Sequence, residues 1–504
     1  MSSAPPASKD RPARASGAAP SPDQQLFLDE AARLLGPSGL TRDSETLAPW
    51  LTDWRGRYHG AALALASPAS TSEVAELVKL CARHHIPIVP QGGNSGMAGG
   101  ATPDQSGDAI LLSLRRMDAI RTLDPEAASA VCEAGVILQT LHEAAAAHDL
   151  RFPLTLGGKG SATIGGLIST NAGGTQVLRY GTMRAQVLGI EAVLADGEVF
   201  EALTPLKKDN RGFDLKQLLI GSEGTLGIVT AAHVRLVPDP RARVAAWIGL
   251  TSVVTARLVL REIDKAMGQA LEGFEIVPAH CLASVLDHLP DARSPLECTH
   301  AWNALIECTG DEPHGLRTRF EEALAAILEK GLIEDAAIAA NETQAEAFWA
   351  LRDSISAAER ARGPAVQHDI SVPVDRMPEF ILAAIPAIEA RFPGTTGAAF
   401  GHLGDGNVHF HVLAPDGAQP GVWEESAGKQ VSAHVHDLVT EWGGSISAEH
   451  GIGQMKVDEL ARLGDPVALS LMRRIKQALD PDGLLNPGKL VPQGPAPERA
   501  SSDA

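Results

Sequence analysis

Cysteine is scarce in this chain, and the few cysteines show no metal-binding pattern. The 504 residues include five Cys, and no two of them are spaced as C-x-x-C. An odd number without paired spacing argues against a disulfide framework and against a thiolate metal site. We therefore expect a reducing, cytoplasmic location.

Excess positive charge and long apolar runs are also missing. Lys and Arg total 43 against 62 Asp and Glu, which gives a net charge of −19 at pH 7. A nucleic-acid binder needs a basic face for the phosphates, so no nucleic-acid partner is expected. No stretch reaches the roughly 18 apolar residues of a membrane-spanning helix, so no transmembrane segment is expected either.

Two common phosphate-binding motifs are absent. No G-x-G-x-x-G occurs, which excludes the dinucleotide fingerprint of nicotinamide enzymes. Residues 483–489 match the start of a P-loop, but Leu490 replaces its Ser or Thr and Pro487 lacks a backbone N–H. This match is interpreted as chance.

The distribution of apolar residues and glycines predicts an α+β protein with several parts. Strands alternate with helices early in the chain, as at 72–84, where apolar residues recur at helical spacing. Glycines then become rare and Ala-rich helical stretches alternate with strands. We predict a ligand-binding domain, an inserted α+β domain and a C-terminal segment that packs back on the first domain, between two disordered tails. The predicted ranges are a tail at 1–25, the domains at 26–240 and 241–445, the returning segment at 446–492 and a tail at 493–504.

Glycine gathers in three clusters within the first predicted domain. They lie at 91–100, 157–189 and 221–227. Glycine lets the backbone approach a ligand closely, and successive backbone N–H groups in such turns form a concave site for anions. Three such clusters predict a cradle for a large, phosphate-bearing cofactor.

Four segments that contain these glycines resemble a known family. They are PIVPQGGNSGMAGG (87–100), GGLISTNAGG (165–174), RYGTMRAQVLGIEAVLADG (179–197) and LLIGSEGTLGIVT (218–230). They are similar to the FAD-binding domain of the vanillyl-alcohol-oxidase superfamily, in the D-lactate and D-2-hydroxyglutarate dehydrogenase branch of the FAD-linked oxidases. The resemblance implies a two-subdomain FAD-binding domain at 26–240 and an α+β cap over the flavin at 241–445.

The resemblance also implies which residues contact FAD. Asn94 stands where covalent members often carry a His, so non-covalent FAD is expected. Asn486 has an equal alternative reading as part of a helix-stopping Asn-Pro turn. The expected contacts are Gln91, Gly92, Gly93, Asn94, Ser95, Gly96, Gly157, Gly158, Ser161, Gly165, Gly166, Asn171, Gly173, Gly221, Glu223, Gly224, Gly227, Ile228 and Asn486.

Histidine gathers near the end of the second predicted domain. Six of 17 His lie between 402 and 450. If residues 405–406 form a two-residue hairpin turn, His402 sits directly opposite His409, and both imidazoles can reach one metal at about 2.0–2.1 Å. Glu449 is a candidate third ligand, and half-buried polar histidines are the alternative.

The family resemblance assigns roles to this cluster. It implies that His402, His409 and Glu449 hold a divalent metal and that His450 is the catalytic base. Zinc is the expected ion, with manganese as the alternative. His411 shares the face of His409, because side chains repeat every two residues along a strand, and is expected at the substrate.

Three further residues are candidates for substrate binding. The segment at 347–359 resembles the family stretch that supplies an Arg to the substrate carboxylate, which implies this role for Arg352, with Ser356 one helical turn on. A surface Arg paired with a neighbouring carboxylate is the alternative. Gln367 stands where members that oxidise 2-hydroxyglutarate place a Lys, which favours a smaller or monocarboxylate substrate such as D-lactate.

The resemblance implies an FAD-dependent, metal-assisted dehydrogenase. It would oxidise a D-2-hydroxy acid, D-lactate-like or D-2-hydroxyglutarate, to the 2-oxo acid by hydride transfer to flavin N5. The electron acceptor would be a quinone, an electron-transfer flavoprotein or a cytochrome, and a homodimer is compatible with the size. A zinc-dependent hydrolase and a non-enzymatic flavin electron relay are the alternatives.

Overall fold

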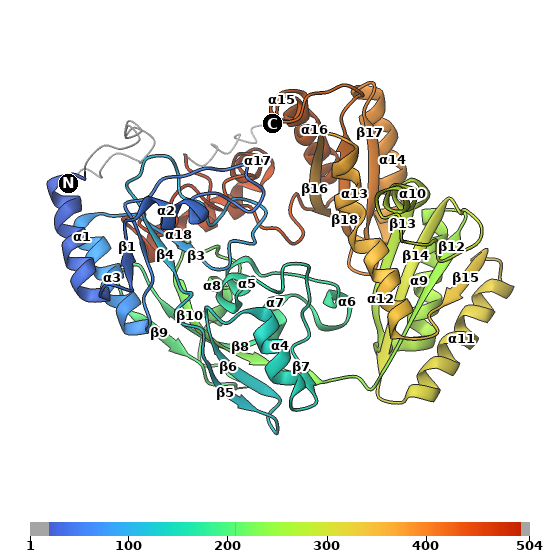
Figure 1. The fold of residues 1–504 in the computed structure, drawn as a ribbon, viewed down its shortest axis with the longest axis horizontal. Helices are drawn as coiled ribbons and strands as arrows, with labels where there is room; N and C mark the ends of the chain where they lie inside the picture. Colours follow the sequence, from blue (N-terminus) through green and yellow to red (C-terminus); the bar gives the residue numbers. More distant parts are fainter. Residues whose placement is uncertain (1–19, 207, 495–504) are drawn as a thin grey trace, which may run out of the picture.

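The computed structural model describes residues 20–206 and 208–494, which form two lobes. Figure 1 shows the N-terminal elements together with α18 in one lobe, and β12–β18 with their helices in the other. The chain therefore leaves the first lobe, builds the second and returns. None of the described helices is both long and apolar enough to cross a membrane.

The first subdomain is built on a four-stranded sheet of order β1-β2-β4-β3. The three strands β2, β4 and β3 are parallel, and β1 is antiparallel at the edge. The N-terminus of α3 is capped by Ser70, and the helix buries the apolar stripe that its sequence predicts. The elements are α1 (Pro22–Leu35), β1 (Leu40–Thr41), α2 (Ser44–Leu47), η2 (Ala48–Trp50), β2 (Ala64–Ala66), α3 (Thr71–His84), β3 (Ile88–Gln91) and β4 (Ile110–Ser113).

The second subdomain is built on a five-stranded antiparallel sheet of order β5-β6-β10-β8-β9. A separate pair, β7 and β11, lies close to the passage into the second lobe. The elements are β5 (Ile120–Asp124), β6 (Ser129–Glu133), α4 (Leu138–Ala146), β7 (Leu150–Arg151), α5 (Ile164–Thr170), α6 (Val177–Tyr180), α7 (Met183–Gln186), β8 (Val187–Val193), β9 (Val199–Ala202), α8 (Lys216–Leu219), β10 (Ile228–Arg235) and β11 (Val237–Pro238).

The second lobe, which corresponds to the predicted cap, is an antiparallel seven-stranded sheet of order β15-β12-β14-β13-β17-β18-β16 with helices packed on it. Its buried core is the largest apolar cluster of the described chain. The elements are β12 (Ala242–Leu250), α9 (Val253–Met267), η3 (Gly268–Ala270), β13 (Leu271–Pro278), α10 (Ala279–His288), β14 (Trp302–Gly310), α11 (Pro313–Glu329), β15 (Asp335–Ile338), α12 (Glu342–Asp353), α13 (Ile355–Arg362), β16 (Ala365–Ser371), η4 (Val374–Arg376), α14 (Met377–Arg391), β17 (Thr396–His402), β18 (Asn407–Leu413), α15 (Val422–Glu425) and α16 (Ala427–Glu441).

In the C-terminal segment, α17 (Val457–Leu463) packs against α16 of the second lobe, where Glu459 pairs with His436. Helix α18 (Pro466–Leu479) packs on the first lobe through Ile475 and Leu479. Leu485 forms a parallel bridge with Ile88 at the edge of β3. The Lys476 ammonium donates to the backbone oxygens of Thr225 at 2.7 Å and Leu485 at 2.8 Å. These bonds return the chain to the domain where it began.

The ends of the chain differ in part from the predicted tails. Helix α1 begins at Pro22, so its first turn falls inside the range 1–25 that the sequence predicted as disordered. A capping box formed by Ser21 and Gln24 starts this helix. The rest of that tail, and most of the tail at 493–504, lie outside the described residues.

Candidate active site

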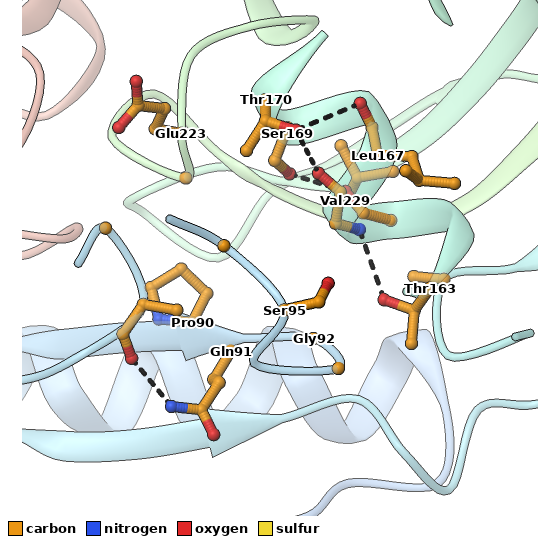
Figure 2. Close-up of a pocket in the computed structure, with 18 of the residues that line it drawn as sticks. Pro90, Gln91, Gly92, Ser95, Thr163, Leu167, Ser169, Thr170, Glu223 and Val229 are labelled. Carbon is orange, nitrogen blue, oxygen red and sulfur yellow. Dashed lines mark hydrogen bonds between the residues drawn. The ribbon is translucent and has the colours of Figure 1, made fainter. Parts of the chain in front are cut away.

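The first lobe contains a pocket between its two subdomains, with walls built by the glycine clusters. The pocket encloses about 970 Å³, including the space at its mouth. Figure 2 shows Pro90, Gln91 and Gly92 on one side and Thr163, Leu167 and Thr170 on the other. The predicted cofactor contacts that line it are Gln91, Gly92, Gly93, Asn94, Ser95, Gly96, Gly165, Gly166, Glu223, Gly224, Gly227 and Ile228.

The loop after β3 presents its backbone to this pocket. Among the described residues, the backbone N–H groups of residues 93–96 find no acceptor. Asn94 adopts a left-handed φ of 51°, and its side chain donates to the backbone oxygen of Thr52 at 2.8 Å. A Cβ placed on Gly93 would lie 1.7 Å from the backbone oxygen of Ser161, so only glycine fits this close approach.

The opposite wall is the N-terminal half of α5 and the loop around Glu223. Thr163 caps α5 by accepting the backbone N–H of Gly166 at 3.4 Å. The buried Glu223 carboxylate accepts the backbone N–H groups of Ile452 at 2.7 Å and Gly453 at 2.8 Å. Glu223 therefore ties the returning C-terminal segment to the pocket.

The remaining predicted cofactor residues do not line this pocket, and two of them, Asn171 and Asn486, hold segments beside it. Asn171 ends α5 and accepts the side-chain hydroxyl of Thr182 and the backbone N–H of Arg184. Asn486 donates to the backbone oxygens of Gly100 at 2.9 Å and Glu223 at 2.8 Å. The residues outside the lining are Gly157, Gly158, Ser161, Asn171, Gly173, Gly221 and Asn486.

Gly173 has a different neighbour from the one expected. A Cβ placed on it would lie 3.0 Å from Oε1 of Glu449. Its lack of a side chain therefore leaves room for that carboxylate, which belongs to the histidine cluster.

The predicted two-residue hairpin is wrong in register. Four residues, 403–406, connect β17 to β18, and His402 pairs with Asn407 while Phe400 pairs with His409. His402 and His409 are thus diagonal neighbours, with ring centroids 5.5 Å apart. They stay on one face because a shift of two residues preserves the side of the sheet.

The histidine pair and Glu449 form a compact group of potential ligands. One ligand atom from each of His402, His409 and Glu449 lies within 4.8 Å of the others, and Asp369, Glu449 and His450 form a second such group. The Arg352 Nη2 atom lies 3.1 Å from Nε2 of His402 and 3.3 Å from Nε2 of His409. The two Nε2 atoms therefore both face the positively charged guanidinium of Arg352.

Two buried carboxylates stand behind this group. Glu275 Oε1 lies 2.5 Å from Nδ1 of His402, and its Oε2 accepts Nε of Arg352 at 2.7 Å. Asp369 Oδ1 accepts the Asn407 amide at 2.7 Å and lies 3.9 Å from Nδ1 of His409. Such carboxylates orient imidazole ligands with Nε2 toward the shared point.

The charges of this group are strongly perturbed. Burial alone would raise the pKa of the Asp369 carboxyl, but its interactions with His450, Lys456 and His409 and with the backbone N–H of Glu449 outweigh burial and hold the pKa below its usual range. Burial lowers the pKa of His409 well below that of a free imidazole, and Arg352 and His402 add to this effect. Burial, with the negative charges of Asp369 and Asp405, raises the pKa of Glu449 to about 7 against the opposing charges of His402 and Arg352.

His450 joins the two parts of the site. It is among the residues that line the pocket of the first lobe. Its backbone N–H donates to Asp369 Oδ2 at 2.9 Å, and its Nδ1 lies 3.6 Å from the same oxygen. Burial lowers the pKa of His450, although the charge of Asp369 opposes this shift, which favours a neutral imidazole able to accept a proton.

The other predicted substrate residues divide between the site and its surroundings. Arg352 lies at the cluster and pairs with Glu275 rather than only with a helix neighbour. The prediction of one continuous helix through Ser356 is wrong, because α12 ends at Asp353 and α13 begins at Ile355. His411 pairs through Nδ1 with the buried Glu359.

Several residues of the site were not found from the sequence. Asp369 follows Gln367 by two positions in a strand, a spacing that places both on one face, and this signal was available. Thr163 precedes an apolar helix, which is the signature of an N-cap. Glu275 carries no local signal, because its role depends on the pairing of β13 with β17.

Comparison with known proteins decides the family. Residues 62–203 match the family model "FAD binding domain", and residues 239–490 match "FAD linked oxidases, C-terminal domain". The chain belongs to the FAD-linked oxidases. It is accordingly an FAD-dependent oxidoreductase with the two-domain α+β fold that the sequence predicted.

Relatives of this FAD-linked oxidase cover most of its length. It is 36% identical to the probable mitochondrial D-2-hydroxyglutarate dehydrogenase of Oryza sativa subsp. indica, over 91% of this chain and 80% of that protein. It is 37% identical to mitochondrial D-2-hydroxyglutarate dehydrogenase of Bos taurus, over 90% of this chain and 82% of that protein. Both names place these relatives in mitochondria, which contradicts the cytoplasmic location expected from the cysteines.

A solved structure shares the fold. p-Cresol methylhydroxylase with substrate bound superposes with a TM-score of 0.73 at 17% identity, over 94% of this chain and 97% of that chain. At this identity the likeness concerns the architecture alone.

The pocket and the cluster each fit the group that the family implies. The unpaired backbone N–H groups at 93–96 suit a pyrophosphate, because they are donors on a glycine-rich turn. The Nε2 atoms of His402 and His409, which the Arg352 guanidinium contacts in this structure, form with the Glu449 carboxylate a nitrogen and oxygen donor set suited to a divalent cation.

Proposed function

We propose that this protein is an FAD-dependent, metal-assisted dehydrogenase that oxidises a D-2-hydroxy acid to the 2-oxo acid. The observation that carries the proposal is the position of His450. It lines the glycine-walled pocket and also lies with Asp369 and Glu449 in the cluster of potential ligands. A substrate carbon between the two would face the flavin while its hydroxyl faces the cluster.

The chemistry divides between the bound groups and the protein. When bound, FAD supplies a hydride acceptor at N5, and a divalent metal, zinc or manganese, supplies a Lewis acid. His402, His409 and Glu449 would hold the metal. The loop at 92–96 holds the FAD pyrophosphate without a covalent bond.

The side chains of the cluster handle the substrate itself. Arg352 binds the carboxylate of the acid, because its planar fork matches two carboxylate oxygens. His450 takes the proton of the hydroxyl as hydride leaves Cα. The Asp369 carboxylate holds His450 in place by accepting the backbone N–H of His450, and it also faces the His450 ring.

The two alternatives explain only part of this arrangement. A zinc hydrolase accounts for the histidine cluster but gives no reason for His450 to line a cofactor pocket. An electron relay accounts for the pocket but gives no reason for Arg352 and the metal ligands. Neither alternative uses both halves of the site.

The test is an anaerobic titration of the flavin spectrum with D-lactate, D-2-hydroxyglutarate, D-malate and glycolate. The proposal expects at least one D-2-hydroxy acid to bleach the flavin with formation of its 2-oxo acid. A flavin spectrum that no 2-hydroxy acid changes would favour the relay. Metal-dependent hydrolysis in flavin-free protein would favour the hydrolase.

A further inference from the structure

One hydrogen bond crosses from the FAD-binding domain to the cap at the edge of the candidate site. The Nη1 atom of Arg55 donates to Oε1 of Gln367 at 2.8 Å, although the two residues are 312 positions apart. The buried Asp53 carboxylate fixes the loop that carries Arg55 by accepting the backbone N–H groups of Arg55, Arg57 and Tyr58. Arg55 is therefore presented on a well-anchored turn.

The register of the cap sheet places Gln367 beside the cluster. Gln367 pairs with His411, and Asp369 pairs with His409 in the next row on the same face. Residues two apart on a strand are about 6.6 Å apart. Gln367 thus lies about 6.6 Å along the strand from Asp369, which faces His450. The carbon chain of a small acid can span this distance.

The hydrogen bond to Gln367 and the register of β16 place Arg55 close to the reacting end of the site. Burial lowers the pKa of Arg55, and the nearby negative charges of Asp53 and Asp369 oppose this shift. Arg55 therefore belongs to the electrostatic environment of the cluster.

Arg55 and Gln367 have donors in excess of acceptors. The Gln367 Nε2 atom is buried and has no hydrogen-bond partner among the described residues. In the described part of the chain, Arg55 forms no ion pair with a carboxylate. Burial lowers the pKa of Arg55 to about 10, and the positive charges of Arg57 and Arg360 lower it further. This end of the site therefore carries a guanidinium whose hydrogen-bond partner is a neutral amide.

We propose that Arg55 and Gln367 receive a second carboxylate of the substrate, so that the enzyme acts on a 2-hydroxydicarboxylate. The inference rests on the proposed function and extends it. Arg352 from the cap binds the carboxylate next to the hydroxyl, and Arg55 from the FAD-binding domain binds the distal one. The guanidinium of Arg55 replaces the charge that a Lys at position 367 would carry, which revises the expectation of a monocarboxylate.

The test compares acids that differ only at the distal end. The pairs are D-2-hydroxyglutarate with D-2-hydroxyvalerate, and D-malate with D-2-hydroxybutyrate. In wild type, kcat/KM is expected to be higher for the dicarboxylate of at least one pair. In Arg55→Gln, kcat/KM for that acid should fall by about 10- to 100-fold, mainly through KM, because a charge-assisted contact is lost. The value for its monocarboxylate partner should change by less than about twofold.

Binding provides a second readout, independent of turnover. Calorimetry should show that 2-oxoglutarate binds less tightly to Arg55→Gln than to wild type, with an intermediate loss in Arg55→Lys. Arg42→Gln, which removes an exposed arginine of the same domain, is the control and should match wild type.

Each other outcome overturns the inference. Equal losses for both acids of a pair would make Arg55 a structural residue, and no loss would remove it from the site. A wild type that oxidises only monocarboxylates would refute the distal site while the proposed function stands. A wild type reduced by none of the acids would refute both.

Discussion

The backbone N–H of His450 donates to Asp369 at 2.9 Å, and the His450 ring lies 3.6 Å from the same carboxylate oxygen. Asp369 also accepts the backbone N–H of Glu449 at 2.8 Å. One buried carboxylate thus positions both the proposed base and a proposed metal ligand. This shared support makes Asp369 a positioning residue for the whole cluster.

Replacing Asp369 should therefore damage catalysis while leaving the glycine-rich walls of the flavin pocket unchanged. In Asp369→Asn, the amide NH2 would face an existing donor, and kcat or metal affinity should fall by about 10- to 100-fold. Steady-state kinetics and metal analysis measure the effect, while the visible flavin spectrum should persist. Asp416→Asn, at an exposed position, serves as the control. An unchanged kcat together with unchanged metal content would rule out the positioning role.

Removal of the metal should abolish oxidation of the hydroxy acid while FAD remains bound. In His409→Ala, one of two converging Nε2 atoms is lost, so the protein should lose its divalent metal and turnover. Elemental analysis and a chelator titration measure this. His434→Ala, on helix α16 and outside both ligand groups, should retain metal and activity. A chelated protein that keeps its full rate would contradict the metal's proposed role.

The glycine at position 93 should be essential for FAD binding. In Gly93→Ala, the new Cβ would collide with the backbone oxygen of Ser161, and overpacking of this kind costs about 1–3 kcal/mol. We expect less FAD per protein chain and a lower melting temperature. Gly160→Ala is the matched control, because a Cβ there would meet only the side chain of Gln139, at the ordinary contact distance of 3.7 Å. Equal FAD content in both variants would refute the cradle.

Glu223 should stabilise the returning C-terminal segment. Glu223→Ala leaves the backbone N–H groups of Ile452 and Gly453 without their acceptor, at a cost of about 1–3 kcal/mol for each unpaired donor. Urea denaturation of the FAD-free protein measures the loss. Glu201→Ala, at an exposed position in β9, should leave the free energy of unfolding unchanged. Stability equal to wild type would show that the segment is held elsewhere.

Local sequence patterns predicted the individual helices and the glycine-rich loop. The strand register and the contacts between domains depend on residues far apart in the sequence, and local patterns did not predict them. The stripe in α3 and the glycines at 92–96 could be read directly, because periodicity and glycine clusters act over a few residues. The register of the hairpin at 403–406 could not be read from the sequence, because a four-residue connection is present where a two-residue turn was expected. The contact between Arg55 and Gln367 depends on how two domains meet, which no local pattern encodes.

The central claim is that His450 joins the flavin pocket to the site where the hydroxy acid loses its hydride and proton. The most direct measurement is anaerobic rapid mixing of the flavin-loaded protein with a D-2-hydroxy acid that carries hydrogen or deuterium at Cα. We expect a primary isotope effect on flavin bleaching in wild type, and bleaching about 10²- to 10⁴-fold slower in His450→Ala with FAD still bound. If the flavin of His450→Ala bleached at the wild-type rate, and neither protein showed an isotope effect, the proposed role of His450 would be contradicted.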